Sequence, residues 1–197
     1  VKAGIAFGGA YAAIGGAKEA ISTTDDLAKA TISLHKNLGL TVKSASEWAA
    51  VAKTRNVDVK ALNMSFGTLS KNILASHDAT SKQADLFKQL GVAQRDLKSG
   101  DFNRVLAQTA DGLKAMGPGA DRTAISMKLF GRGWQTIVPL LRDGSKAMNA
   151  QLALADKYGV TFKGKTVKSL EDLIQAQRES KFATMGLLCF HESMSNL

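Results

Sequence analysis

The sequence contains a single cysteine, Cys189, so no disulfide bond can form within the chain. That absence excludes the small secreted folds that depend on several disulfide bonds. Proline is also scarce, with 2 in 197 residues, and only 6% of the residues are aromatic. Because alanine, leucine and lysine are common while valine, isoleucine and tyrosine are sparse, the composition favours helices over sheets. We therefore predict an all-α fold.

Acidic residues are outnumbered, with 17 against 26 lysines and arginines, which gives a formal net charge of +9. A net positive charge favours anionic partners, such as nucleic acid, anionic lipid or an acidic protein surface. The cations are spread along the chain without a block of five or six, as is typical of solvated helix faces. Weak, non-specific binding to nucleic acid therefore stays an alternative function and not the leading one.

No hydrophobic run is long enough to span a bilayer by itself. The one uncharged apolar stretch, residues 3–17, lies between Lys2 and Lys18 and is rich in glycine and alanine. A spanning helix needs about 20 apolar residues, and this stretch is shorter. Small residues four positions apart, such as Gly4 and Gly8, allow another helix to approach closely. We predict an apolar helix over residues 1–22, with insertion into a host membrane as the alternative.

Residues 23–187 read as a series of short amphipathic helices joined by glycine-containing turns. Asp58 and Asp101 are cap residues that each precede apolar positions at helical spacing. Glycines follow many of these patterns and stop them. We predict a compact multi-helix bundle, with these residues in its core: Phe66, Leu69, Phe87, Phe102, Leu106, Leu129, Phe130, Trp134 and Leu141. Ala124 and Met116 are placed on the same apolar faces.

Cap residues and breakers also predict where individual helices begin and end. Helix starts are expected at residues 22–25, at residues 44–47, at residues 80–83, and at Ser169 with Asp172. Pro139 should kink or shorten its helix because it lacks a backbone N–H. Residues 160–165 are the one place where a short strand or an extended turn is expected.

Few residues have the spacing of a metal or nucleotide site. Cys189 and His191 have no second Cys/His pair at zinc-ligand spacing, and His35 and His77 stand alone. The Gly-Arg-Gly sequence at 131–133 follows a helical pattern, whereas a dinucleotide-binding loop follows a strand. We therefore predict no metal, no cofactor and no small-molecule substrate.

The remaining candidates for chemistry have simpler interpretations. Glu19, Glu47, Glu171 and Glu179 occupy surface-type helical positions near lysine or arginine, which favours ion pairing over acid–base catalysis. Trp48, Phe66, Phe130 and Trp134 have the chemistry to stack on nucleic-acid bases, but each falls on an apolar helix face that favours core packing. No catalytic residue is predicted, and the chain is not expected to be an enzyme.

Several segments, taken in order, resemble the tail tape measure proteins of bacteriophages and prophages. They are residues 48–53, 64–71, 84–91, 101–116, 122–124, 127–132 and 138–144. The run from Leu-Phe-Gly-Arg at 129–132 to Pro-Leu-Leu at 139–141, followed by Gly144, is fairly specific to that family. The resemblance covers about residues 1–187, whereas residues 188–197 depart from it and form a divergent tail.

The resemblance implies a structural virion component that acts in tail length determination, tail assembly and genome ejection. Its implied partners are the tail tube protein and tail assembly chaperones. Its implied location is the tail tube lumen of the virion, and the host cytoplasm during assembly. A membrane-active role for residues 3–17, which would help to form a DNA conduit at the host envelope, is compatible with this function.

A ruler function and a bundle fold make opposite demands on the chain. An α-helix rises about 1.5 Å per residue, so an extended helical chain measures length in proportion to its residue number. Helices of ordinary length separated by glycines instead collapse into a bundle in water. We therefore hypothesise a module that is compact when free and that extends about its glycine turns inside the tube.

Overall fold

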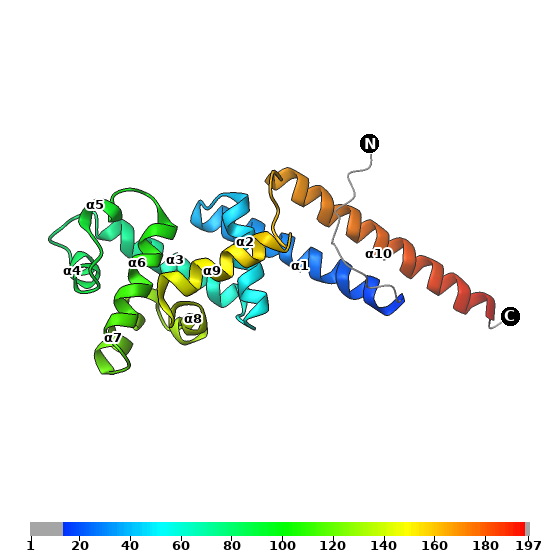
Figure 1. Ribbon diagram of the computed structural model, residues 1–197. Coiled ribbons are helices and arrows are strands. Elements are labelled where there is room, and N and C mark those ends of the chain that lie inside the picture. The colour runs from blue at the N-terminus through cyan, green and yellow to red at the C-terminus, as the bar shows by residue number, and fades with distance from the viewer. Residues whose placement is uncertain (1–13, 196–197) are drawn as a thin grey trace.

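Ten helices and no strand make up residues 14–195, the part of the chain that the computed structural model describes (Figure 1). Side-chain environments are described for residues 23–183 and for Met185. The all-α prediction is confirmed. In chain order the helices are α1 (Ile14–Leu38), α2 (Val42–Thr54), α3 (Val59–Ala75), α4 (Lys82–Gln89), α5 (Gln94–Leu97), α6 (Phe102–Ala115), α7 (Ala120–Phe130), α8 (Trp134–Leu141), α9 (Gly144–Lys157) and α10 (Val167–Ser195).

The helices form a packed body with an arm at one end. Helices α2 to α9 make the body, in which α3 packs against α7 and α8 while α9 packs against α6 and α2. Helix α1 contacts α2 and α3 near its C-terminal end, and α10 runs antiparallel to it to form the arm (Figure 1). The predicted multi-helix bundle is thus confirmed.

Three aromatic rings from three helices meet at the centre of the body. The rings of Trp48 and Phe66 are perpendicular with centroids 5.0 Å apart, and Phe102 lies 5.3 Å from Phe66. Trp48 is fully buried, and its indole N–H donates to Asn103 Oδ1 at 3.0 Å. The Asn103 amide in turn donates to Ser44 Oγ at 2.8 Å. The bond to Asn103 satisfies the only polar atom of the indole, and buried polar atoms in proteins are generally hydrogen-bonded in this way.

The predicted core residues are buried with one exception. Eight of the nine are buried, and Trp134 is partly buried and packs against the core. Two further placements are wrong. Ala124 is exposed, because the face of α7 that packs against the core carries Ile125 and Leu129 and does not include Ala124. Met116 follows the last residue of α6 and is 38% exposed.

Several predicted helix starts are displaced. Helix α1 runs through residues 22–25 without interruption, and the Asp25 carboxylate accepts from Lys29 one turn later instead of capping a helix. Helix α2 begins earlier than expected, because Thr41 Oγ1 accepts from the N–H of Ser44. Aspartate, serine and threonine side chains can also form other local hydrogen bonds, so a residue able to cap a helix does not always mark its start.

Later helix starts are close to their predicted positions. Asp58 and Asp101 cap α3 and α6 as predicted. Ser81 caps α4 by accepting from Ala84 N at 3.1 Å. Helix α10 begins at Val167, because Thr166 and Ser169 exchange hydrogen bonds in a capping box ahead of the predicted start.

Two further expectations concern the chain after α7. Pro139 lies inside α8, which ends two residues later, in agreement with the expected shortening. Residues 160–165 form turns, and no strand occurs there or elsewhere in residues 14–195, so the strand alternative is wrong. The predicted boundaries after residues 22 and 187 stay predictions, although α1 and α10 each continue across one of them.

Candidate functional site at the α1–α2–α3 groove

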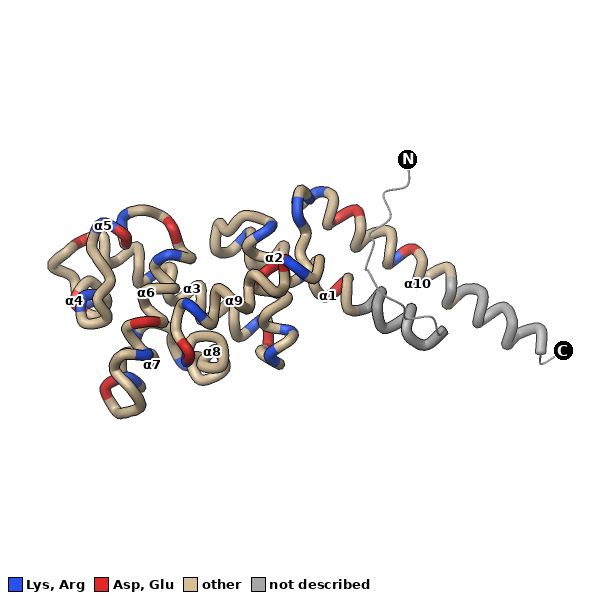
Figure 2. Tube along the Cα trace, viewed as in Figure 1, with Lys and Arg blue, Asp and Glu red and all other residues tan. Residues whose placement is uncertain are grey.

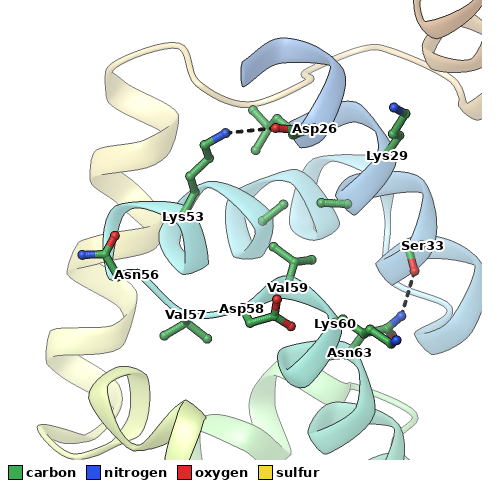
Figure 3. A pocket seen from close by; sticks show the side chains of 13 residues that line it. Asp26, Lys29, Ser33, Lys53, Asn56, Val57, Asp58, Val59, Lys60 and Asn63 are labelled. Atoms are coloured by element: carbon green, nitrogen blue, oxygen red, sulfur yellow. Dashed lines mark hydrogen bonds and ion pairs between the residues drawn. The ribbon is translucent and has the colours of Figure 1, made fainter. Parts of the chain in front are cut away.

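A groove of about 670 Å³ lies where α1, α2 and the first turn of α3 meet (Figure 3). Its floor is apolar and includes Leu27, Ala49 and Val57, which are buried. Its edge carries lysine, aspartate and asparagine side chains from all three helices. The sequence predicts no site from these lining residues, because they lie far apart along the chain.

The wall of the groove is a tight connection between α2 and α3. Asn56 has a φ of 54°, in the left-handed region, which ends α2 and turns the chain. Val57 N then donates back to Ala52 O at 2.8 Å, and the Asp58 carboxylate accepts from Ala61 N at 2.7 Å. Both ends of this connection are therefore hydrogen-bonded, so the groove has a fixed wall.

Two polar contacts cross the groove between helices (Figure 3). Lys53 Nζ lies 3.6 Å from Asp26 Oδ2 and links α2 to α1. Asn63 Nδ2 donates to Ser33 Oγ at 2.8 Å and links α3 to α1. The other amide atom, Asn63 Oδ1, is buried without a hydrogen-bond partner among the described residues. These contacts hold α1 against the body.

The charges around the groove are nearly balanced. Lys29 Nζ lies 2.7 Å from Asp25 Oδ2, whose side chain is only 6% exposed. Lys60 has no carboxylate partner among the described residues, and Asp58 is used as a helix cap. Ser33 Oγ accepts a hydrogen bond from Asn63. None of the lining residues is a histidine, cysteine or glutamate. The groove thus offers a packing surface and not an arrangement of nucleophile and base.

The two histidines that stand alone in the sequence also stand apart in the structure. His35 Nδ1 donates to the carbonyl oxygen of Leu40 at 2.6 Å, across the turn between α1 and α2. His77 Nε2 donates to the carbonyl oxygen of Leu97 at 3.0 Å and joins the end of α3 to α5. Each imidazole therefore stabilises a connection between helices through one hydrogen bond to a backbone carbonyl.

Two of the four candidate carboxylates form ion pairs, one within a helix and one between two helices. Glu47 Oε1 lies 2.6 Å from Lys43 Nζ, and Glu171 Oε1 lies 2.9 Å from Lys36 Nζ. The hydrogen bond from Lys43 to Glu47 raises the pKa of Lys43. Glu179 accepts from an amide, that of Gln175, at 2.9 Å instead of from a cation. Glu19, Cys189 and His191 lie outside the described side chains.

Across the described residues the charges intermingle. Figure 2 shows acidic and basic residues alternating over the helices, with no block of one sign. No group of three or more His, Cys, Asp or Glu side chains within the described part is placed to hold a metal ion. Among the described helices, none has the length and apolar character to cross a bilayer. The apolar stretch at residues 3–17 lies largely outside the described residues.

The aromatic residues considered for base stacking differ in their surroundings. Trp48 and Phe66 are fully buried and Phe130 is 2% exposed, so none of these rings is open to a base. Trp134 is partly buried and lines a cleft between α7 and α8. Core burial is confirmed for three of the four, and Trp134 packs against the core while it also lines the cleft.

Comparison of the chain with protein-family models, with curated proteins and with solved structures finds no match.

Proposed function

We propose that this chain is a structural helical module of a bacteriophage tail tape measure protein. The observation that carries the proposal is the ordered set of segments described above, and above all the run over residues 129–144. In the fold this run ends α7, turns at Gly131 with a φ of 76°, forms α8 and turns again at Gly144 with a φ of 81°. Leu129, Phe130 and Leu141 are buried. The residues of the run thus shape the fold, as a structural module requires.

The proposed role is to set tail length, with tail tube protein polymerising around the chain and tail assembly chaperones holding it beforehand. The module would be compact when free and extended inside the tube lumen of the virion. Extension at the glycine turns keeps each helix intact, because a helix retains its own backbone hydrogen bonds when its neighbours separate. The same extended chain would leave ahead of DNA during ejection.

Tail length tests the ruler role directly. In-frame removal of this 197-residue segment from the gene that encodes it should shorten the tails by up to about 300 Å, at 1.5 Å per residue. Replacement by an unrelated helical segment of equal length should restore the length. Electron microscopy of purified tails measures both. Tails of unchanged length after the removal would contradict the proposal.

Cross-linking tests the proposed extension. A carbodiimide joins an amine to a carboxylate in contact, and Lys36 of α1 lies 2.9 Å from Glu171 of α10. This cross-link should form in the free chain and disappear in assembled tails. Lys43 and Glu47 form the matched control, because they lie one turn apart in α2 and should remain cross-linked in both states. A Lys36–Glu171 cross-link that persists in tails would show that the bundle does not open.

A further inference from the structure

A second cleft, of about 390 Å³, lies between the first turn of α7 and the length of α8. The cleft is open to solvent. Pro118 and Val138 contribute apolar surface, while Arg122, Trp134, Gln135 and Arg142 contribute groups able to recognise a ligand. This combination of two guanidinium groups and an indole in one cleft occurs away from the α1–α2–α3 groove.

The two arginines of the cleft make few interactions that stabilise the fold. Arg122 is partly buried, yet it has no carboxylate or hydrogen-bond partner among the described residues. Arg142 Nε lies 3.2 Å from Asp143 Oδ1, in a pair that is exposed on both sides. Exposed pairs contribute little to stability, and the rest of the Arg142 guanidinium stays free to donate. Two arginines on one cleft are suited to an anion with several oxygens.

Trp134 adds a planar apolar surface to this charge. It packs partly against the core, which holds the ring in place, and it also lines the cleft beside Gln135. Nucleic-acid bases stack on such rings in proteins that bind single strands, while arginines contact the phosphates. An acidic peptide would satisfy the arginines but would make no use of the ring.

We propose that the α7–α8 cleft binds one nucleotide unit of a single-stranded nucleic acid. Arg122 and Arg142 contact the phosphate, and the base lies against Trp134. The cleft volume falls in the range of small-ligand sites. The net charge of +9 supports the approach of a strand from any direction, whereas the two arginines define where one phosphate is held. This assignment stands independently of the tail function.

The test uses the full chain and a 20-nucleotide oligothymidylate, with intrinsic tryptophan fluorescence as the readout. Trp48 is fully buried, so a ligand-dependent change in emission reports Trp134. Arg122→Gln and Arg142→Gln should each weaken binding about tenfold, which is the effect of losing one charge-assisted contact. Arg178→Gln is the matched control, because Arg178 is an exposed arginine on α10 and its loss changes the net charge equally. Circular dichroism confirms that each variant is folded.

Salt dependence separates the cleft from general attraction. Loss of one phosphate contact should reduce the slope of log K against log salt by about 0.7 in Arg122→Gln and leave it unchanged in Arg178→Gln. Asp143→Asn should tighten binding, since it frees Arg142. Equal weakening in all three arginine variants, or no binding by the folded wild-type chain, would overturn the proposal.

Two further ligands define the class of molecule that the cleft accepts. Thymidine monophosphate should bind more weakly than the strand, and polyglutamate should not change the Trp134 emission. Equal affinity for the mononucleotide would assign the site to free nucleotides and reject the strand. Equal competition by polyglutamate would show a general polyanion surface and reject the role of the ring.

Discussion

Gly112 is a position where two segments of the body approach closely. It lies inside α6, and a Cβ atom there would lie 2.7 Å from Leu90 Cβ and closer still to the Leu90 carbonyl oxygen. Backbone cannot move aside as a flexible side chain does, so Gly112→Ala should lower the free energy of unfolding by about 1–3 kcal/mol. Urea unfolding followed by circular dichroism measures this loss.

Gly67 supplies the control for that substitution. It also lies inside a helix, α3, but a Cβ atom there would meet nothing within 4 Å. Gly67→Ala should therefore stabilise the fold by about 0.5–1 kcal/mol through helix propensity alone. Similar effects at both glycines would mean that the contact with Leu90 is unimportant.

The side chain of Asn72, in α3, forms its hydrogen bonds with a neighbouring helix, α7. Its side-chain amide donates to Lys128 O at 3.0 Å and to Leu129 O at 2.9 Å, at the C-terminal end of α7. Asn72→Ala leaves these carbonyls without that donor and should cost about 1–2 kcal/mol. Lys71→Ala removes the adjacent, exposed side chain and should be close to neutral in the same unfolding experiment. Asn72→Asp should be at least as harmful, because it places a charge against the carbonyl oxygens.

At the scale of elements, α10 is held mainly by its first two turns. Leu170 and Ile174 are buried, whereas the described residues after Ile174 are exposed or at most partly buried. Leu170→Ala should therefore release α10 by local opening, at a cost of about 2–5 kcal/mol. Hydrogen exchange should show lost protection in α10 and retained protection in α3 and α6. Phe182→Ala is the control, since Phe182 is 72% exposed. Equal loss of protection in every helix would contradict the local mechanism.

The contact of α9 with α2 and with the segment before α10 should depend on pH, because it includes a paired carboxylate. Asp156 Oδ2 lies 2.8 Å from Lys163 Nζ and 3.8 Å from Lys43 Nζ. The hydrogen bond from Lys163, together with that from Thr161, lowers the pKa of Asp156 below its ordinary value of 3.8. A lowered pKa stabilises the fold at pH values above the ordinary pKa, and this contribution is lost as the pH falls through the folded-state value.

Stability measured from pH 7 down to about pH 2 should therefore decline less steeply in Asp156→Asn than in the wild-type chain. The variant should also be the less stable of the two at pH 7. Asp121→Asn is the control, because Asp121 is exposed and has no ion pair or hydrogen bond of its side chain among the described residues. Parallel pH profiles for the wild-type chain and Asp156→Asn would contradict the assignment.

At the scale of the molecule, the arm of α1 and α10 makes the shape longer than a sphere (Figure 1). A compact chain of 197 residues has a radius of gyration of about 16 Å. Small-angle scattering should give a larger value, with a tail at long distances in the pair-distance distribution. A radius near 16 Å with a symmetric distribution would mean that the arm folds back onto the body in solution.

The sequence predicted features that depend on neighbours along the chain. Asp58 and Asp101 cap helices as expected, and the apolar stripe that includes Phe66 and Leu69 is buried, because capping and helical periodicity act within a few residues. The short α5 was not predicted, since four residues carry too little periodicity to be recognised. The start of α1 was misjudged because Asp25 pairs with Lys29 within a continuous helix.

Neither the α1–α2–α3 groove nor the α7–α8 cleft could be predicted from local sequence patterns. The α1–α2–α3 groove unites Asp26 with Lys53 and Ser33 with Asn63, and the α7–α8 cleft unites Arg122 with Arg142. These partners are 20 or more residues apart, and helical periodicity says nothing about which helices become neighbours. Trp134 illustrates the limit, because its apolar spacing predicts burial while only packing decides that part of the ring lines a cleft.

The sequence by itself determined the helical class, most of the core and the glycine turns, because each of these follows from local propensity, periodicity and φ preferences. Only the tertiary structure decided that α10 lies antiparallel to α1, that Asn72 caps α7 and that Gly112 permits the approach of Leu90. The physical reason is that helix packing joins surfaces from distant parts of the chain, and many pairings satisfy the same local pattern. Side-chain shape and the few polar contacts between helices select one of them.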